Sequence, residues 1–551
     1  MKLNYKRTIL VGFAFFLISA FWQAYDQIVP LILTNHYGLS QFASGIVMSL
    51  DNVLAVILLP VFGALSDKVC TKWGKRTPFI FVGTILAVIA FISLTFVDNM
   101  QYSAIMNHTI EKMTYAEAET FGASVAELSA AAHASGNAAL SEIALKESEA
   151  LTRLWEATSI SEQYAAVDTL RSQAYKLMAE ARSASDAALV SLANGQLDTV
   201  DLLFGDIEAT TRAITMANIL PLVLFLVTLL LVLVSMAIFR SPAVALMPDI
   251  TVKPLRSKGN AIINLMGTAG GIIVLVLGMI FATKQIYMQY TWYVVAVGSV
   301  MLIGLIVFLF TVKEKPWAEE MLIEAKKLEA AEAKTVGAPE VLSRKLSRPE
   351  IKSLILILAS VALWYIGYNS ITSKYSVYAT RELGFDPNFT LIVAQAAAVI
   401  AYIPVGIVAS KLGRRKTILA GITMLASAFL LGNFITPLSP EFLMYPIFVL
   451  AGVGWATINV NSFPMVVELA RGGDVGKYTG YYYTASMSAQ IVAPILSGLL
   501  YTAFGTMRNV YFIFGAIFVA LSFATMFFVK HGDAKAEKHG LLESLAGADD
   551  D

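Results

Sequence analysis

The sequence contains few of the residues on which enzymes and disulfide-stabilised proteins depend. It has one cysteine, Cys70, among 551 residues, which excludes an intramolecular disulfide framework and a cysteine-rich metal site. No nucleophile–base pair and no glycine-rich phosphate-binding loop are evident in the sequence. The pattern therefore predicts neither an enzyme nor an ATP-driven machine, and it requires no cofactor and no metal.

Histidine and charged residues are also scarce. Five histidines fall outside the long apolar runs, which argues against a histidine proton relay in a membrane: His36, His108, His133, His531 and His539. Only 15% of the residues are charged, against about 25% in soluble domains, and 57% are hydrophobic. The formal net charge is zero, so there is no electrostatic case for nucleic acid. The low charge indicates that much of the surface contacts a lipid bilayer.

Long apolar runs are what the sequence has instead. A membrane-spanning helix needs about 20 mostly apolar residues. We identify twelve such runs, at residues 8–34, 42–66, 77–97, 217–247, 259–283, 290–312, 352–379, 388–410, 416–435, 441–467, 477–503 and 508–530. The sequence therefore predicts an all-α, multi-pass membrane protein with twelve spanning helices.

Basic residues in the short loops predict how these helices are oriented, because positively charged loops stay in the cytoplasm. The loops on the side of the N-terminus carry Lys68, Lys72, Lys75, Arg76, Lys253, Arg256, Lys258, Lys411, Arg414, Arg415 and Lys416, and the middle loop adds eight more. The short loops on the other side offer little beyond Lys284, Arg381 and Arg508. We expect a protein of the cell (plasma or inner) membrane with both termini in the cytoplasm.

The spacing of the runs divides the chain into two related halves. We assign 1–97 and 216–312 to an N-terminal half, 98–215 to an insertion, 313–351 to a cytoplasmic linker, 352–530 to a C-terminal half and 531–551 to a cytoplasmic tail. Without the 118-residue insertion, the part before the linker has 194 residues, close to the 181 residues of 350–530. Two halves of similar length, each with six helices, indicate an internal duplication.

The insertion at 98–215 has a composition of its own. It holds 7 Lys or Arg against 17 Asp or Glu, a net charge of about −10, which suits the external side. The runs 142–157 and 164–193 favour helix. We take as helix breaks the glycines at Gly122, Gly136, Gly195 and Gly205. A helical spacer or cap on the outer face is the simplest interpretation, and a domain that binds a partner or captures substrate is the alternative.

Two similar loop motifs occupy equivalent places in the halves. Gly63-Ala-Leu-Ser-Asp67 precedes Gly74-Lys75-Arg76, and Gly406 precedes Gly413-Arg414-Arg415. A glycine lets two helices approach closely, and an aspartate there can pair with a nearby Arg or Lys. A positively charged loop with a helix cap would be the ordinary explanation. The repetition instead indicates a latch that breaks and reforms.

Acidic residues at two further helix ends can form ion pairs of the same kind. Pro242-Ala-Val-Ala-Leu-Met-Pro-Asp249 precedes Arg256, and Pro464-Met-Val-Val-Glu468 stands at the equivalent place in the second half. Each acid can meet neighbouring basic residues at an inner helix end. We predict as gating residues Gly63, Asp67, Arg76, Asp249, Arg256, Arg414, Arg415 and Glu468.

These motifs resemble those of the major facilitator superfamily. The Arg76-Thr-Pro-Phe-Ile ending of the first loop, the stretch 242–249 and Asn260-Ala261 are similar to the sugar–cation symporters, the branch of the plant sucrose–proton symporters and their bacterial relatives. More distantly they resemble glycoside–pentoside–hexuronide symporters. The chain has Val244 where sucrose symporters carry an arginine. The resemblance covers all twelve spans but not the insertion, and it implies alternating access around a site in mid-membrane.

Charged residues inside the apolar runs are few, and a charge there usually faces a cavity or a partner. Asp51, beside Asn52, lies about 14 Å into its helix, and Asp26 lies about 27 Å along the first. We predict that Asp51, with Asp26 as the competitor, exchanges the coupling proton. A structural hydrogen bond is the alternative for both. Arg240 either faces the cavity as a counter-ion or extends its charge to the membrane surface.

Amide and aromatic side chains inside the spans suit a sugar, because hydroxyls need paired donors and acceptors and C–H faces stack on rings. Each aromatic residue taken alone could instead pack or face lipid. The residues predicted to bind substrate are Trp22, Gln23, Tyr25, Asn52, Arg240, Trp364, Tyr368, Asn369, Gln395, Asn459 and Gln490.

The sequence thus predicts a secondary active transporter that moves a sugar, an α-glucoside or oligosaccharide, with protons. Two alternatives remain open at this point. The same fold could carry another small solute or use sodium. The spans could also anchor a receptor or scaffold that works through the external insertion.

Overall fold

The chain folds almost entirely into helices. The computed structural model describes residues 4–108, 116–252, 255–283, 285, 287–335, 347–469, 475–504, 507 and 510–532. Within these residues there is no β-strand, only an isolated bridge between Thr71 and Gly74.

Twelve long helices within the described residues form the bundle. They are α1 (Tyr5–Leu31, continued by the π-helix η1, Ile32–His36), α2 (Gln41–Lys68), α3 (Thr77–Met106), α8 (Leu220–Ile250), α9 (Arg256–Ile280), α10 (Thr291–Thr311), α12 (Arg348–Thr372, followed by α13, Tyr375–Val377, and η3, Tyr378–Leu383), α14 (Pro387–Leu412), α15 (Arg414–Gly432), α16 (Met444–Val467, preceded by η4, Glu441–Leu443), α17 (Val475–Phe504) and α18 (Tyr511–Phe527). Ten of them are long and apolar enough to span a membrane, and α14 and α18 contain shorter apolar stretches. The predicted twelve-helix fold is confirmed.

Helix starts follow from local capping chemistry. The Ser40 side chain accepts a hydrogen bond from the Ala43 amide at 3.2 Å at the start of α2. At the start of α14, Asp386 accepts from the Asn388 amide at 2.9 Å, with Pro387 in the first turn. Both residues satisfy amides that have no partner within the helix, so they define where the helix begins.

The two halves repeat one packing pattern. In the first half α1 packs on α9 and α10, and α8 packs on α2 and α3. In the second half α12 packs on α17 and α18, and α16 packs on α14 and α15, in the same order along the chain. The halves meet where α2 contacts α17 and α9 contacts α14. The duplication relates these two pairs, because α2 corresponds to α14 and α9 corresponds to α17.

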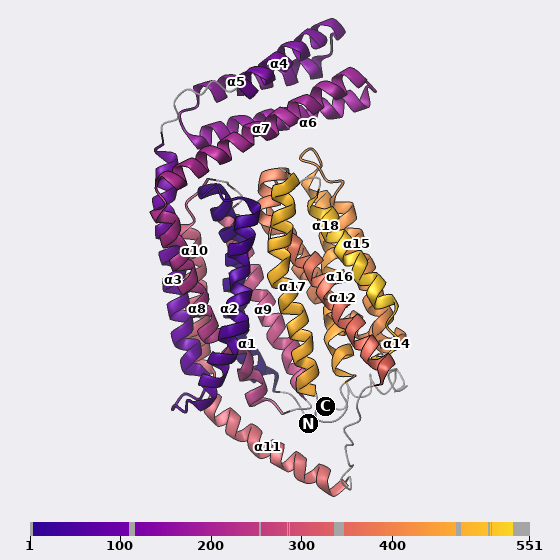
Figure 1. Ribbon diagram of the computed structural model, residues 1–551. Helices are drawn as coiled ribbons and strands as arrows, with labels where there is room; N and C mark the ends of the chain where they lie inside the picture. Colours follow the sequence, from indigo (N-terminus) through magenta and orange to yellow (C-terminus); the bar gives the residue numbers. More distant parts are fainter. Residues whose placement is uncertain are drawn as a thin grey trace.

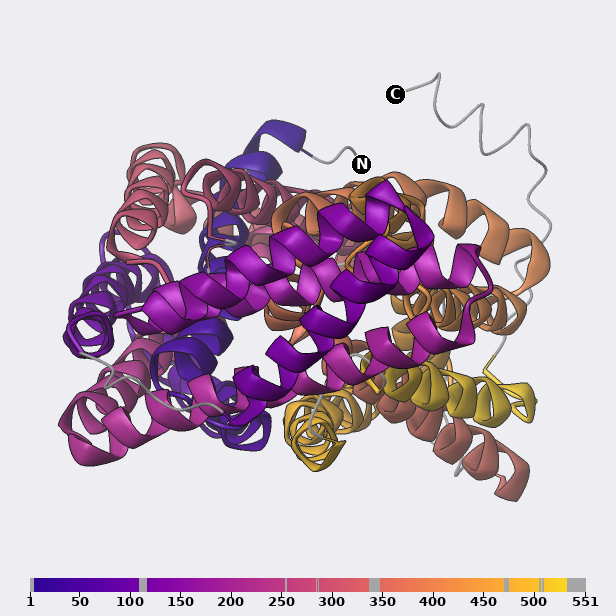
Figure 2. The same ribbon diagram turned by 90° about the horizontal axis from the view of Figure 1, so that it is seen from above.

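The insertion forms a separate layer of four helices at one end of the bundle (Figures 1 and 2). Its helices are α4 (Ala116–Ser135), α5 (Ala138–Glu156), α6 (Ile160–Ser183) and α7 (Ala187–Ala217). Seen from above, they extend from the first half across the second. The start of α1 and the end of α18 lie at the opposite end. We call these two ends the insertion end and the terminal end.

The glycines of the insertion behave differently from one another. Gly136 has a φ of +63° and separates α4 from α5, as predicted. Gly122, Gly195 and Gly205 lie inside helices, so their assignment as breaks was wrong. The break between α6 and α7 comes instead beside Asp186, whose side chain caps α7. An N-cap carboxylate favours a helix start, whereas a single glycine costs a helix only about 1 kcal/mol.

The linker between the halves begins with helix α11 (Glu314–Thr335) at the terminal end (Figure 1). Its start is joined to the first half. Arg7 of α1 forms an ion pair with Glu320 and lies over the Trp317 ring, 5.2 Å from its centroid. These contacts fix the beginning of the linker beneath the N-terminal half.

The halves are tightly closed at the insertion end. The Phe42 amide of α2 donates to Thr502 of α17 at 3.1 Å. Gly45 of α2 lies against the Pro494 carbonyl, and Gly498 of α17 lies against the Gln41 carbonyl. A Cβ atom at either glycine would approach those oxygens to 2.1 and 2.3 Å, so only glycine allows this packing.

Lys374, just after α12, strengthens this closure. Its ammonium group is fully buried and donates to the Gln41 carbonyl at 3.2 Å and to the Ser44 hydroxyl at 3.0 Å. Both acceptors belong to α2, so a side chain of the second half binds the backbone of the first.

Candidate functional site

A cavity of ≈ 470 Å³ lies between the halves. It takes residues from α1 and α9 of the first half and from α12, α14 and α16 of the second. Of the residues predicted to bind substrate or protons, the lining includes Trp22, Gln23, Asp26, Tyr368, Asn369 and Gln395. Its volume is in the range of small-molecule sites.

Amide groups connect the two sides of the cavity. Gln395 of α14 donates to the Gln23 side chain of α1 at 2.6 Å, across the boundary between the halves. Gly271 of α9 lies beside this pair, where a Cβ atom would come within 3.1 Å of the Gln395 oxygen. The pair offers a substrate both hydrogen-bond donors and acceptors.

Aromatic rings form another part of the wall. Tyr368 stacks on Trp455 with ring centroids 5.9 Å apart, and Tyr402 meets Trp455 edge-on at 6.3 Å. All three rings line the cavity, together with Trp22 from the opposite half. The cavity therefore combines ring faces with amides, as the sequence predicted, although neither Tyr402 nor Trp455 was among the residues predicted to bind substrate.

Three charged side chains gather beside the cavity. The guanidinium of Arg240, on α8, lies over the Trp22 ring at 5.2 Å. Asp26, on α1, and Asp51, on α2, are both close enough to interact electrostatically with Arg240. Asp26 is exposed in the cavity wall, whereas Asp51 is only partly exposed and accepts from the Asn52 amide at 2.5 Å and its side chain at 2.7 Å. The arrangement brings one arginine within electrostatic range of two acids.

Other predicted substrate ligands do not line the cavity. Tyr25 and Trp364 are buried in the helix bundle, and neither the Tyr25 hydroxyl nor the Trp364 indole nitrogen has a partner in the described structure. Gln490 donates to the Ser486 carbonyl in its own helix at 3.2 Å. Asn459 interacts with the Tyr402 side chain and is not among the residues that line the cavity.

The predicted latch of the first half is assembled at the terminal end. Arg76 donates to Asp67 at 2.5 Å and to Asp249 of α8 at 2.8 Å. Burial works against the charge of Arg76, but its hydrogen bonds and ion pairs with Asp249 and Asp67 raise the pKa of the guanidinium. Gly63 contacts Ser241 of α8, with 2.9 Å from an ideal Cβ to the hydroxyl, so the glycine allows the close approach that the motif predicts.

Glu314 completes this latch, and sequence reasoning missed it. Its carboxylate accepts hydrogen bonds from the amides of Lys75, Arg76 and Thr77 at 2.6, 2.9 and 2.8 Å, and from the Thr77 hydroxyl at 2.7 Å. The residue is 3% exposed although it begins the linker helix. It therefore caps α3 and holds the loop that carries Arg76. In sequence it is one acid among several in the linker, with nothing to mark it.

The latch of the second half is simpler. Arg414 forms an ion pair with Glu468, and Arg415 donates to the Phe527 carbonyl and lies 5.8 Å from the centroid of the Phe527 ring. Both contacts lie within the second half, as the Arg76 pairs lie within the first. The side chain of Arg256 falls outside the described part of the chain.

Two polar clusters at the insertion end were not predicted. Gln27 of α1 donates to Thr283 at 2.8 Å and to Asn388 of α14, and it accepts from Tyr293 at 2.9 Å. These buried groups link the halves above the cavity. A spacing rule cannot find such a cluster, because its members come from four separate segments.

His36 overturns the expectation that the histidines lie outside the spans. It ends η1, which continues the first span, and its Nδ1 lies 2.8 Å from Asp98 of α3. Both side chains are fully buried, and Tyr102 and Tyr290 surround the imidazole with centroids 5.4 and 5.7 Å away. The expected span ended two residues too early, because the polar run Thr34-Asn35-His36 resembles a loop.

Known proteins resemble this chain over most of its length. A family model described as "Major Facilitator Superfamily" matches residues 209–401 and 388–544, more than half of the chain, and one described as "MFS/sugar transport protein" matches residues 10–125. A search among curated proteins finds no match.

Solved structures share the fold. The inward-open xylose transporter XylE from E. coli is 12% identical with a TM-score of 0.55, covering 99% of this chain and 100% of that one. A D-xylose-proton symporter is 12% identical at a TM-score of 0.55, covering 96% and 99%. A POT family transporter bound to 5-aminolevulinic acid is 10% identical at 0.54, covering 94% of each chain. At these identities the likeness is one of fold.

Proposed function

Because the chain belongs to the Major Facilitator Superfamily, a superfamily of transporters rather than enzymes, we propose that it carries a sugar across the membrane together with protons. The observation that carries this proposal is the composition of the cavity. It presents amides and aromatic faces from both halves and one exposed carboxylate, Asp26.

The amides and rings favour a sugar over other solutes. Gln23, Gln395 and Asn369 can each donate and accept, which matches the paired hydroxyls of a sugar ring. Tyr368 and Trp455 offer faces to the C–H side of the same ring. The cavity of ≈ 470 Å³ has room for an α-glucoside or a short oligosaccharide. The sugar-transport model that matches residues 10–125 supports the same class of substrate.

The charges beside the cavity supply the proposed coupling. Asp26 faces the cavity and can exchange a proton with water there. Arg240 interacts electrostatically with both Asp26 and Asp51, and the Asp51 carboxylate is already occupied by two hydrogen bonds from Asn52. We therefore place the transported proton on Asp26 and give Asp51 the part of counter-ion to Arg240. This reverses the order of the two acids expected from the sequence alone.

Alternating access follows from the two ends of the bundle. The halves are joined at the insertion end by Lys374 and by the glycine contacts of α2 and α17. If the basic loops of the terminal end are cytoplasmic, as proposed from the positive-inside rule, this is the state that faces the cytoplasm. Opening the insertion end and closing the terminal end would complete the cycle.

Uptake by proteoliposomes tests the proposal. Labelled disaccharides and trisaccharides are offered with a pH gradient and, separately, with a sodium gradient. We expect accumulation of at least one sugar with the pH gradient only. Accumulation with sodium alone would make the protein a sodium symporter. No gradient-dependent uptake of any sugar offered would refute sugar symport and favour the alternatives, a carrier of another small solute or a receptor or scaffold.

Matched carboxylate variants locate the coupling site. Asp26→Asn should abolish accumulation but keep sugar exchange, since the amide is neutral and cannot titrate. Glu119→Gln, an exposed acid of the insertion, is the control and should behave like the parent. Accumulation by Asp26→Asn together with its loss in Asp51→Asn would move the proton to Asp51.

A further inference from the structure

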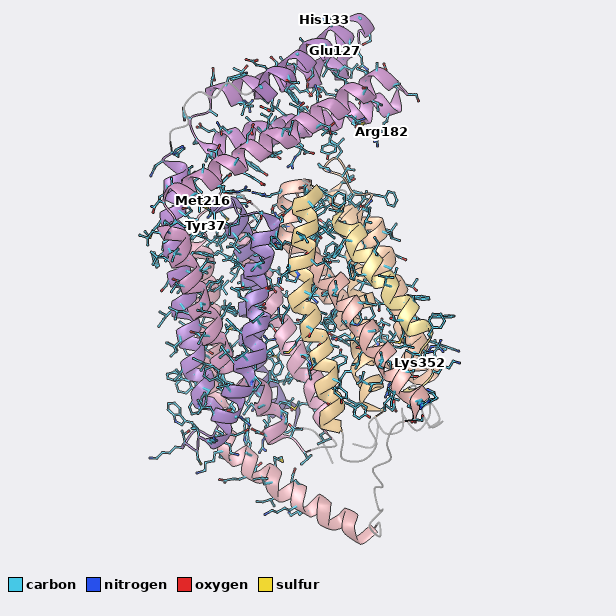
Figure 3. All side chains as sticks on the ribbon, viewed as in Figure 1. Tyr37, Glu127, His133, Arg182, Met216 and Lys352 are labelled. Carbon is cyan, nitrogen blue, oxygen red and sulfur yellow. The ribbon has the colours of Figure 1, made fainter. Side chains whose placement is uncertain are left out.

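The insertion is attached to the first half by hydrogen bonds at its base. Arg212 of α7 donates to the Gly38 carbonyl at 3.0 Å, and Thr215 donates to the Tyr37 carbonyl at 3.1 Å. Gln101 of α3 donates in turn to Thr215 at 2.8 Å. Tyr37 and Met216 mark this junction in Figure 3, at the top of the N-terminal half. The insertion therefore moves with the first half.

From that base the insertion reaches the second half at Arg381, in the π-helix η3. The Arg381 guanidinium forms an ion pair with Glu208 of α7, and its backbone carbonyl accepts a hydrogen bond from Arg171 of α6. The side chains of Arg381 and Arg171 are only 13% and 9% exposed. The Glu208 side chain is 40% exposed, so its pair with Arg381 is worth more than a fully exposed surface pair but less than a buried one.

Arg381 also contacts the first half directly. Its Nε donates to the Asn35 side chain at 2.5 Å, and its Nη2 donates to the Thr34 carbonyl at 3.3 Å. One arginine of the second half thus binds both the bundle and the insertion. All of its partners belong to bodies that must move away from it when the insertion end opens.

A second contact lies farther out along the insertion. Leu438, in the loop between α15 and α16, packs against the apolar cluster of the distal insertion, which includes Ile143 and Leu177. In Figures 1 and 3 this distal part, near Arg182, stands above the second half. The insertion is therefore fastened to one half and rests on the other at two separate places.

We propose that the insertion is a strap across the outer gate and that Arg381 is its gating residue. The strap stabilises the state closed at the insertion end, and it must release Arg381 and Leu438 before that end opens. The inference rests on alternating access in the proposed function, but not on the identity of the solute. On this proposal the insertion controls a step of the transport cycle, whereas a spacer would not affect it.

Distances between spin labels test the strap without any substrate, so a wrong sugar cannot obscure the result. The labels are placed on exposed residues near the insertion end of each half, Ala104 and Phe434, with Cys70→Ser as background. Glu208→Gln removes the negative charge that pairs with Arg381, but it leaves the hydrogen bond from Arg381 to Asn35. We expect the ratio of open to closed molecules to rise roughly five- to tenfold.

A double-mutant cycle and a control make the result specific. In an Arg381→Gln background, Glu208→Gln should have no further effect, because the pair is already broken. Glu149→Gln breaks an exposed pair with Arg153 inside α5 and should leave the distances unchanged. Thermal unfolding shows whether each variant is folded.

Leu438→Ala is a second test, used if the Glu208 variant does not fold. Leu438 lies outside the insertion but packs against its distal cluster. Leu438→Ala should also shift the distances toward the open state. Unchanged distances in folded Glu208→Gln or in Leu438→Ala would overturn the strap. A shift in distances without sugar transport would refute the proposed function and leave the strap standing.

Discussion

Adding one methyl group at Gly45 should hold the insertion end open. A Cβ atom there would meet the Pro494 carbonyl oxygen at 2.1 Å and the carbonyl carbon at 2.8 Å. Both atoms belong to the backbone of α17, which cannot rotate away as a side chain could. In the Gly45→Ala variant, α2 and α17 must therefore move apart by about 1 Å before the new Cβ and the Pro494 oxygen reach an ordinary van der Waals distance.

The expected size of the effect follows from overpacking. Forcing one extra carbon into a close-packed contact costs about 1–3 kcal/mol. The cost falls only on the closed state, because α2 and α17 part at this point when the insertion end opens. With about 1.4 kcal/mol for each factor of ten, the ratio of open to closed molecules should rise roughly five- to 150-fold.

The accessibility of the cavity measures this shift. A Thr268→Cys reporter lines the cavity, and Cys70 is replaced by serine. We expect Gly45→Ala to speed alkylation of the reporter from the insertion side on the order of tenfold, and to slow net uptake.

Gly480→Ala is the matched control for this experiment. It lies on α17 near the terminal end, where a Cβ atom would meet nothing within 4 Å. It should label like the parent. If Gly45→Ala also labels and transports like the parent, then the contact of Gly45 with Pro494 does not close the insertion end, and the reasoning fails.

Three further predictions concern other parts of the chain. Burial raises the pKa of Glu147, in the core of the insertion, from 4.5 to about 8. The neutral carboxyl therefore contributes stability that is fully present below pH 4.5 and that is lost, up to ~5 kcal/mol, as the pH rises through 8. In the parent, the insertion should lose protection from protease between pH 5 and 9; Glu147→Gln should remove this loss, and an unchanged pH profile in the variant would contradict the prediction. Glu314→Gln should lower the maximal transport rate several-fold without weakening sugar binding, because the carboxylate holds the Arg76 loop and not the cavity; a selective loss of affinity would place it elsewhere. Asp67→Asn should likewise slow transport more than it weakens binding, and an unchanged maximal rate would refute a part in the latch.

The spans could be predicted closely because the bilayer sets their length. The run predicted at 42–66 is α2, Gln41–Lys68, and the run at 388–410 is α14, Pro387–Leu412. The end of α3 was placed too early, at 97, because Asp98 follows. The structure continues α3 to Met106, since His36 pairs with that buried aspartate. A pair formed by residues 62 positions apart leaves no local sign in the sequence.

The cavity could be predicted in kind but not residue by residue. Tyr368 lines it, while Trp364, one turn earlier on the same helix, packs on Tyr365 with ring centroids 4.0 Å apart. Spanning helices are apolar on every side, so the sequence does not fix how each helix is rotated about its axis. The partners of Arg381 could not be predicted either. In the sequence it is a single charge in a short loop, and its partner Glu208 lies in the insertion, 173 residues earlier.

The central claim, that sugar and protons move together, is tested most directly by proton flux in de-energised proteoliposomes. A sugar that the uptake screen identifies is added outside, with no pH or sodium gradient, and the external pH is followed. Sugar moving down its gradient should carry protons inward and make the medium more alkaline. Asp26→Asn should transport the sugar without this change. Sugar entry through the unmodified protein with no proton movement would contradict the account.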